Sequence, residues 1–225
     1  MEEEIGGQFR IILESPTAYQ NHELLLEKLS HYGVRGTTNS WFRSYLKNRR
    51  QSIEINQSDS RNVLVNRFRS PLMTLKQGIP QGSVLGPLLF LLYINDLPLN
   101  IGANVVMFAD DINMLITDND IGALQDKINN VTTELEYWFN KNKLVISTNK
   151  TGIMSFYNKH KVHMVKPKVT INKMDLNYIT ETKFLGIHIT ESLKWNSHVK
   201  VLANKLCKVS FMIKSLKETL STYMI

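Results

Sequence analysis

The chain has 225 residues, of which 43% are hydrophobic and 21% are charged. This composition is typical of a folded globular protein and excludes a disordered chain. The single cysteine, Cys207, excludes an internal disulfide framework and a cysteine-rich zinc site, and we expect it to be a small buried residue in a reducing setting. The acidic start has no signal-peptide core, and the longest apolar run, 84–94, is too short for a bilayer. We therefore expect no membrane role and an intracellular location, nuclear or cytoplasmic.

The net charge of +7 is unevenly distributed along the chain. Residues 1–112 hold 11 basic and 11 acidic side chains, so residues 113–225 supply the whole excess. Between residues 141 and 217 there are 15 lysines and only three acids. Such a surface attracts polyanions, of which nucleic acid is the commonest in cells. A solvated lysine-rich surface without a partner explains the charge equally well.

The predicted elements of the first half are two helices, a ribbon and a buried helix. Residues 21–33 favour a helix with Asn21 as N-cap and Gly33 as its stop, and a second helix follows within 39–50. Residues 51–56 and 63–76 are expected to form strands of a ribbon. The segment 83–98 reads as a buried helix with Ser83 as its cap and Pro87 in its first turn.

The second half is predicted to begin with a hairpin of strands 105–109 and 112–116. Apolar residues at helical spacing then predict a helix over 120–142. Short strands are expected at 143–147, 152–157, 168–171 and 184–189, and a lysine-rich amphipathic helix from about Ser197 closes the chain. The plan is that of an α+β protein in which helices pack on one face of an antiparallel sheet.

Two adjacent acids, Asp110 and Asp111, stand at the tip of the predicted hairpin. Two carboxylates at one tip repel each other unless a cation lies between them, so the pair suggests a Mg²⁺ or Mn²⁺ site with oxygen ligands. The alternative is a polar turn, although tight hairpin turns favour Asn-Gly or Asp-Gly.

A glycine-containing loop, 78–82, leads into the helix that Ser83 is predicted to cap. Glycine lets the backbone approach a phosphate closely, and the helix N-terminus is electropositive. The alternative is an ordinary loop with a good N-cap. Because one helix separates this loop from the hairpin, we expect the loop and the carboxylates to face the same cleft.

Four motifs occur in the order "QGIPQGSVLGPLLFLLYINDLP", "FADD", "KLVISTNKTGIMSF" and "FLGIHI". In this order they resemble the palm motifs of reverse transcriptases from non-LTR retrotransposons, particularly the jockey-like group of insects. The segment "NHELLLEKLSHYGVRGTTNSWFRSYLKNRRQ" is also similar to the one that follows the first catalytic motif in that family. The resemblance extends from about residue 13 to 200.

The resemblance implies a right-hand polymerase whose palm is an antiparallel sheet with helices packed on one face. It implies RNA-directed DNA synthesis, with an RNA template, a DNA primer and deoxynucleoside triphosphates as partners and two Mg²⁺ or Mn²⁺ ions as cofactors. The residues it assigns are catalytic, metal-binding Asp110 and Asp111; nucleotide- and template-side Gln81, Gly82 and Ser83; triphosphate-side Lys150; and primer-gripping Phe184, Leu185 and Gly186.

The first motif departs from the family pattern. The sequence "IILESPTAYQNHE" puts Glu14 where the catalytic Asp belongs and Tyr19 at the aromatic position that faces the nucleotide. A glutamate displaces its oxygens by roughly 1 Å or more, which can cost about 10²-fold in rate. Alternatively, residues 1–20 are a degenerate or non-homologous start. The expected domains are then this start, a palm over 21–190 and the beginning of a thumb over 191–225.

The same comparison predicts an incomplete copy, with fingers largely missing, a truncated thumb and a family endonuclease that is absent. We expect such a copy to be impaired or inactive by itself, and to depend on the rest of a longer polyprotein. A non-catalytic nucleic-acid-binding relic is the alternative function. A remnant without any role also remains open.

Overall fold

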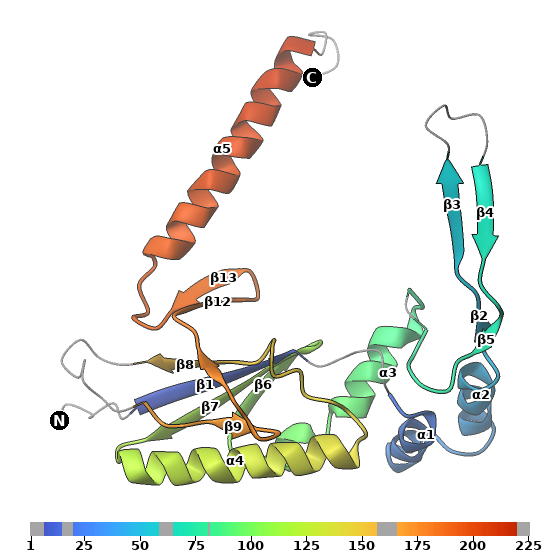
Figure 1. Cartoon of the computed structure of the whole chain (residues 1–225), viewed down its shortest axis with the longest axis horizontal. Coiled ribbons are helices and arrows are strands. Elements are labelled where there is room, and N and C mark those ends of the chain that lie inside the picture. Colours follow the sequence, from blue (N-terminus) through green and yellow to red (C-terminus); the bar gives the residue numbers. More distant parts are fainter. Residues whose placement is uncertain (1–6, 15–19, 59–64, 81, 157–165, 220–225) are drawn as a thin grey trace.

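The computed structural model describes residues 7–14, 20–58, 65–80, 82–156 and 166–219, and the expected mixture of helices and strands is confirmed (Figure 1). The helices are α1 (His22–His31), α2 (Gly36–Leu46), α3 (Leu85–Ile94), the short 3₁₀ helix η1 (Leu97–Leu99), α4 (Ile121–Lys141) and α5 (Asn196–Thr219). The strands are β1 (Gly7–Glu14), β2 (Arg50–Gln51), β3 (Glu54–Ser58), β4 (Val65–Arg69), β5 (Met73–Thr74), β6 (Asn104–Phe108), β7 (Asp111–Asp118), β8 (Gly152–Phe156), β9 (Thr170–Ile171), β10 (Met174–Asp175), β11 (Asn177–Tyr178), β12 (Glu181–Phe184) and β13 (Ile187–Thr190).

A five-stranded sheet with the order β11-β8-β1-β7-β6 is the centre of the fold. Strand β1 pairs antiparallel with β7 on one side and β8 on the other, and only the β11–β8 pair is parallel. Strands β6 and β7 form the predicted hairpin. The main sheet is therefore largely antiparallel, with β1 as its middle strand.

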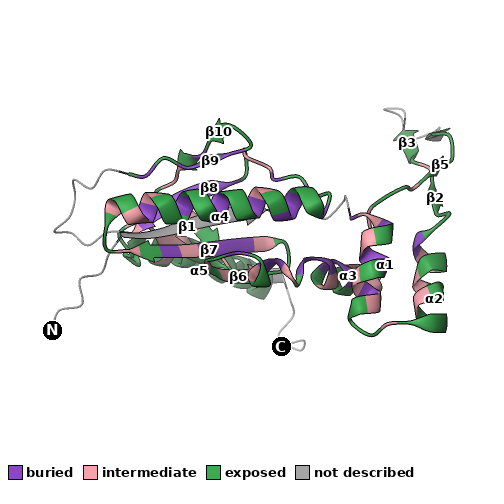
Figure 2. Ribbon diagram, turned by 90° about the horizontal axis from the view of Figure 1, so that it is seen from below, coloured by how far each residue is buried: buried purple, intermediate pink, exposed green. Residues whose placement is uncertain are grey.

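Helix α4 covers one face of this sheet and packs against β7 and β9 (Figure 1). The apolar positions that predicted the helix are its inner face, since Leu124, Ile128, Val131, Leu135 and Trp138 are all buried. The sheet contributes alternate residues of β7, Ile112, Met114 and Ile116, to the same core. Figure 2 shows buried residues concentrated along α4 and β7. The hairpin that carries Asp110 thus grows from a buried strand.

A buried tyrosine joins the helices at the other end of the molecule. Tyr93 of α3 is fully buried, and its hydroxyl accepts a hydrogen bond from the Asn21 amide (3.3 Å) and donates one to the Asn142 carbonyl (2.6 Å). Lys28 of α1 donates to the Tyr93 carbonyl (2.7 Å) and pairs with Asp96 (2.6 Å). Burial lowers the pKa of Lys28, and Asp96 opposes that shift. These contacts hold α1 against the C-terminal end of α3.

Helix α1 begins and ends close to the predicted residues, whereas the predictions for several other elements were wrong. Asn21 caps α1 by accepting from the Leu24 amide (3.2 Å), as expected. Residues 143–147 form no strand, because Leu144 and Ile146 are buried in the core without a ladder partner in the described part of the chain. The strand predicted over 63–76 is divided into β4 and β5, with Pro71, which has no N–H for a ladder, between them.

Two further expectations near the C-terminus were wrong. The strand predicted over 184–189 is interrupted by a turn at Leu185 and Gly186, which both have positive φ. Cys207 is exposed rather than buried, because α5 projects away from the sheet (Figure 1). None of the helices in the described ranges is long and apolar enough to cross a membrane.

The Tyr93 hydroxyl generates the first prediction. Replacing it in Tyr93→Phe leaves the Asn142 carbonyl buried without its donor, so we expect the free energy of unfolding to fall by about 1–2 kcal/mol. Urea denaturation followed by circular dichroism measures the change. Tyr137→Phe is the matched control, because Tyr137 is 67% exposed, and its effect should stay within about 0.5 kcal/mol. Equal effects in both variants would contradict the assignment.

Tyr178 provides a pH-dependent prediction. Burial raises its pKa from 10.0 to about 12, and its hydroxyl donates to the Pro167 carbonyl (2.7 Å). Because the folded chain holds this proton more tightly, the stabilisation is complete below the ordinary pKa and is lost as the pH rises through 12. We expect Tyr178→Phe to show a smaller loss of unfolding free energy than the parent between about pH 9 and about pH 11. Parallel losses in the two proteins, measured in urea, would refute this.

Candidate functional site

The tip of the β6–β7 hairpin is a two-residue turn of Ala109 and Asp110. Phe108 and Asp111 form the last pair of the ladder, so Asp110 lies in the turn and Asp111 begins β7. Ala109 has φ +51°, a conformation that costs a non-glycine residue roughly 1–2 kcal/mol. Such strain persists where the surrounding structure imposes it, and it is concentrated at functional sites. The carboxylate of Asp110 is thereby presented at an exposed tip.

The glycine loop faces this tip across a cavity of about 470 Å³. Gly82, Ser83 and Asp110 all line it, and the apolar part of its wall includes Ile79, Pro80 and Phe90. Gly78 and Gly82 have φ +85° and +75°, which glycine adopts without strain. A Cβ at Gly82 would meet no atom within 4 Å, so its backbone is open to a ligand. The structure therefore brings three of the predicted site residues together.

The loop is held in place from both sides. On the α1 side, the Gly78 amide donates to the Gln20 carbonyl (2.8 Å), and His22 Nε2 donates to the Gly78 carbonyl (2.7 Å). On the α3 side, Ser83 Oγ donates to the Pro80 carbonyl (2.7 Å) and accepts from the Gly86 amide (3.0 Å). The helix begins at Leu85, slightly later than predicted, yet Ser83 still satisfies one of its first amides.

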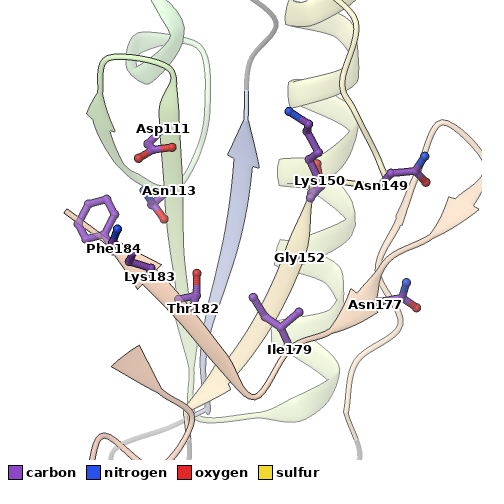
Figure 3. Close-up of a pocket in the computed structure, with 11 residues that line it drawn as sticks. Asp111, Asn113, Asn149, Lys150, Gly152, Asn177, Ile179, Thr182, Lys183 and Phe184 are labelled. Atoms are coloured by element: carbon purple, nitrogen blue, oxygen red, sulfur yellow. The ribbon is translucent and has the colours of Figure 1, made fainter. Parts of the chain in front are cut away.

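A second cavity, of about 280 Å³, lies beside Asp111. Figure 3 shows Asp111 and Asn113 projecting from β7, Lys150 standing just before β8, and Lys183 and Phe184 on β12. Lys150 and Lys183 are exposed and give this cavity positive charge beside a carboxylate. A cavity of this kind suits an anion that also bears a metal ion. It unites three predicted residues, Asp111, Lys150 and Phe184.

Glu14 is the last residue of β1, and the sheet register pairs it with Asp111. Figure 3 shows β1, in blue, between the strands that carry Asp111 and Gly152. The backbone of Glu14 therefore ends beside the carboxylate pair. Two other predicted site residues, Tyr19 and Gln81, lie outside the described residues.

The two aspartates do not converge as the sequence suggested. Asp110 lines the larger cavity and Asp111 the smaller one, because successive residues at a strand end face opposite sides. Within the described ranges, no three His, Cys, Asp or Glu side chains are grouped to hold a metal. Magnesium commonly binds one or two protein carboxylates and completes its shell with substrate phosphates and water. Each aspartate offers carboxylate oxygens of the kind that such an ion binds.

The predicted primer residues form the tip of a second strained hairpin, β12–β13. Phe184 and Ile187 are its last pair, and the turn consists of Leu185 (φ +48°) and Gly186 (φ +86°). A turn with two positive φ values favours Asn-Gly, so a leucine at its first position is unusual. Leu185 is 49% exposed. The hairpin therefore presents an apolar side chain to solvent at a conformational cost.

Sequence reasoning missed several polar residues of the smaller cavity. They are Asn113, Asn149, Asn177, Thr182 and Lys183. Asn113 was detectable, because a residue two positions after Asp111 lies on the same face of a strand. Asn177 was not, since only the parallel pairing of β11 with β8 brings it there.

The Leu185 turn yields a stability prediction. Asparagine tolerates positive φ, so Leu185→Asn should raise the free energy of unfolding by about 1 kcal/mol in urea denaturation. Leu185→Ala is the control, because it removes the same apolar side chain while a Cβ stays in the strained conformation. If alanine stabilised the protein as much as asparagine, the strain would not be the cause.

Comparison with known proteins identifies the family. The model for reverse transcriptase (RNA-dependent DNA polymerase) matches residues 20–189, and β1 lies before that match. The chain is 28% identical over 149 residues to the RNA-directed DNA polymerase from mobile element jockey of Drosophila funebris, covering 63% of this chain and 16% of the relative. It is 29% identical over 137 residues to a Pol polyprotein from retrotransposable element R1 of Nasonia vitripennis, covering 58% and 33%.

A third relative is the probable RNA-directed DNA polymerase from transposon BS of Drosophila melanogaster, at 25% identity over 198 residues, with 82% of this chain and 20% of the relative covered. The chain thus spans one third or less of the length of these relatives. The match to the family model covers most of the chain, and the four motifs lie within or beside it in the expected order. The chain therefore belongs to the reverse transcriptase family, in the branch of the non-LTR retrotransposons.

Proposed function

We propose that this chain is the catalytic core of an RNA-directed DNA polymerase that transfers nucleotides to a primer 3′-hydroxyl. One observation carries the proposal. The turn that presents Asp110 and Asp111 separates two cavities, one lined by the glycine loop and the other by Lys150 and the β12 strand. A polymerase needs acids that stand beside both reactants, because the metal ions must contact the primer 3′-oxygen and the phosphates of the incoming nucleotide at the same time.

The parts of the fold take their names from this function. The five-stranded sheet with α4 is the palm, within a domain over 21–190 to which β1 contributes its middle strand. Residues 191–225 are the beginning of a thumb, and α5 is the helix within this segment. The alignments cover one third or less of each relative, so fingers and the remainder of a thumb would belong to other parts of such a longer polyprotein.

Asp110 and Asp111 would hold Mg²⁺ or Mn²⁺ with the substrate's own phosphate oxygens. When bound, such ions lower the pKa of the primer hydroxyl and stabilise the leaving pyrophosphate. The 3′-oxygen forms a bond to the α-phosphorus, the bond to pyrophosphate breaks, and the hydroxyl proton passes to solvent. The protein's own contribution is to position the reactants and to supply charge.

The described residues suit these tasks. Lys150, at the rim of the smaller cavity, would neutralise the triphosphate. Gly82 and Ser83 would contact the nucleotide and template through a backbone that lies open beside Asp110. The exposed turn after Phe184 would hold the primer end against the palm. Lysines in the basic region 141–217 would track the two nucleic-acid backbones.

Glu14 would be the third carboxylate, and its pairing with Asp111 supports this over a non-homologous start. The first residue of the catalytic set is then a glutamate, whose longer side chain displaces its oxygens by roughly 1 Å. We infer an enzyme that is impaired rather than ideal. A non-catalytic nucleic-acid-binding relic is the second candidate, because the lysine-rich surface would persist without catalysis.

The test is primer extension on an RNA template, with Mg²⁺ and then Mn²⁺. We expect slow incorporation by the parent, none above background by Asp110→Asn, and a gain of up to about 10²-fold in Glu14→Asp. Asp126→Asn is the matched control, because Asp126 is an exposed acid of α4 that lines neither cavity, and it should behave as the parent does.

The outcomes separate the two candidates. Incorporation that Asp110→Asn does not abolish would refute the assigned site. No incorporation by any variant, from protein shown by circular dichroism to be folded, would refute catalysis by this chain alone. If that folded protein still bound the template, the relic function would be supported.

A further inference from the structure

Helix α2 carries a column of flat side chains on its surface. The rings of Trp41 and Tyr45, one helical turn apart, are stacked at 5.6 Å with an interplanar angle of 11°. The Arg49 guanidinium lies over the same Tyr45 ring at 5.3 Å from its centroid. These three residues, called the aromatic column below, lie in sequence along one side of the helix and its exit. Neither cavity of the candidate site includes any of them.

The outer end of the aromatic column is open to solvent. Phe42 and Tyr45 pack against the hydrophobic core, whereas Trp41 is 52% exposed and is not part of that core. Tyr45 covers one face of the indole, and Phe42 contacts it edge-on at 5.1 Å. Packing accounts for Tyr45 but leaves the exposed Trp41 surface unexplained. An indole held rigidly with an open surface is a platform on which another flat group can stack.

Positive charge continues from the aromatic column along the ribbon of β2–β5. Arg49 and Arg50 stand at its base, and Arg67 and Arg69 lie on one face of β4, two residues apart. All four are exposed, and the described part of 47–76 contains a single acid, Glu54. Figure 1 shows the β3–β4 ribbon extending beyond the end of α2. The arginines therefore extend from one end of the aromatic column along the ribbon and do not encircle the column.

A ligand for this surface must offer flat faces at one end and repeated negative charge along its length. Single-stranded nucleic acid does so, because its bases stack on aromatic rings and its phosphates pair with arginines. A duplex hides its base faces within its own stack, and an acidic protein has no series of flat groups. Charge and shape together select a single strand.

We propose that the aromatic column and Arg50, Arg67 and Arg69 bind single-stranded RNA outside the catalytic cleft. The choice of RNA rather than DNA rests on the proposed function, in which the template is RNA. One base stacks on Trp41, and the adjoining phosphates follow the arginines along the ribbon. The surface holds the template strand before it enters the cleft.

The test measures the affinity of the whole chain for a fluorescently labelled single-stranded RNA by anisotropy, in EDTA so that no polymerisation occurs. Trp41→Ala should weaken binding about tenfold, as expected for loss of one stacked base, and Trp41→Phe should retain most of the affinity. Arg49→Gln should reduce the salt dependence of log Kd by roughly 0.7 per decade of salt. Circular dichroism and urea unfolding confirm that each variant is folded.

A matched control is available on α4, where the ring of Tyr137 is 67% exposed and Lys141 lies over it at 5.8 Å. Tyr137→Ala should leave the RNA affinity unchanged. Direct contact is tested in Trp195→Phe, which retains Trp41 and the buried Trp138, where RNA should quench the emission of Trp41. Because these readings need neither metal nor catalysis, they stand or fall separately from primer extension.

Three results would overturn the proposal. The first is equal RNA affinity in Trp41→Ala and the parent. The second is tighter binding of single-stranded DNA or of duplex than of RNA of the same sequence. The third is the absence of quenching in Trp195→Phe at RNA concentrations that saturate the anisotropy.

Discussion

The buried hydroxyl of Tyr93 fixes the geometry on which the candidate site depends. It joins the Asn21 amide at the start of α1 to the Asn142 carbonyl at the end of α4. The residues on either side of Asn21 hold Gly78, so the glycine loop is attached to the same junction. Since Tyr93 belongs to the helix that follows this loop, a single buried group sets the loop's distance from α4 and the sheet. The cavity between Gly82 and Asp110 is a consequence.

The two hairpins of the candidate site share a physical feature. Each presents its tip through a non-glycine residue at positive φ, Ala109 in one and Leu185 in the other. Neither turn has the sequence that its geometry favours. The β6–β7 turn is held by a strand buried under α4, which offsets the local cost. The β12–β13 turn has less support, because its sheet contains only two strands.

Charge is organised in space differently from its distribution along the chain. The first half is neutral in sum, yet four of its arginines, Arg49, Arg50, Arg67 and Arg69, lie at the ribbon beyond α2, where the described residues include one acid. The lysine excess of the second half contributes Lys150 and Lys183 to the cavity beside Asp111. Two separate basic surfaces therefore exist, one beside the acids and one remote from them. The net charge of each half of the sequence does not reveal these two basic surfaces, because acidic residues elsewhere in the same half cancel the basic ones when the charges are added.

Local patterns were sufficient to predict much of the fold. Helical spacing in 121–138 requires a buried face, so α4 and its core residues followed from the sequence, as did the Asn21 cap and the β6–β7 hairpin. These features depend on contacts between residues close in the chain. The family and the identity of Asp110, Gly82, Lys150 and Phe184 as candidate residues also followed, because the motifs are short and contiguous.

Long-range pairing decided the rest. That β1 is inserted between β7 and β8, with Glu14 opposite Asp111, depends on hydrogen bonds between segments about 100 and about 140 residues apart in the chain. The arrival of Asn177 beside the smaller cavity follows from the pairing of β11 with β8, whereas the separation of Asp110 and Asp111 into two cavities follows from the alternation of side chains at the start of β7. The solvent exposure of Cys207 and Trp41 could not be predicted from the sequence either. Both have apolar side chains, but elements elsewhere in the fold determine whether such a side chain is covered. A sequence pattern indicates which side chains of a segment can be buried. Only the assembled structure determines which other segment covers those side chains.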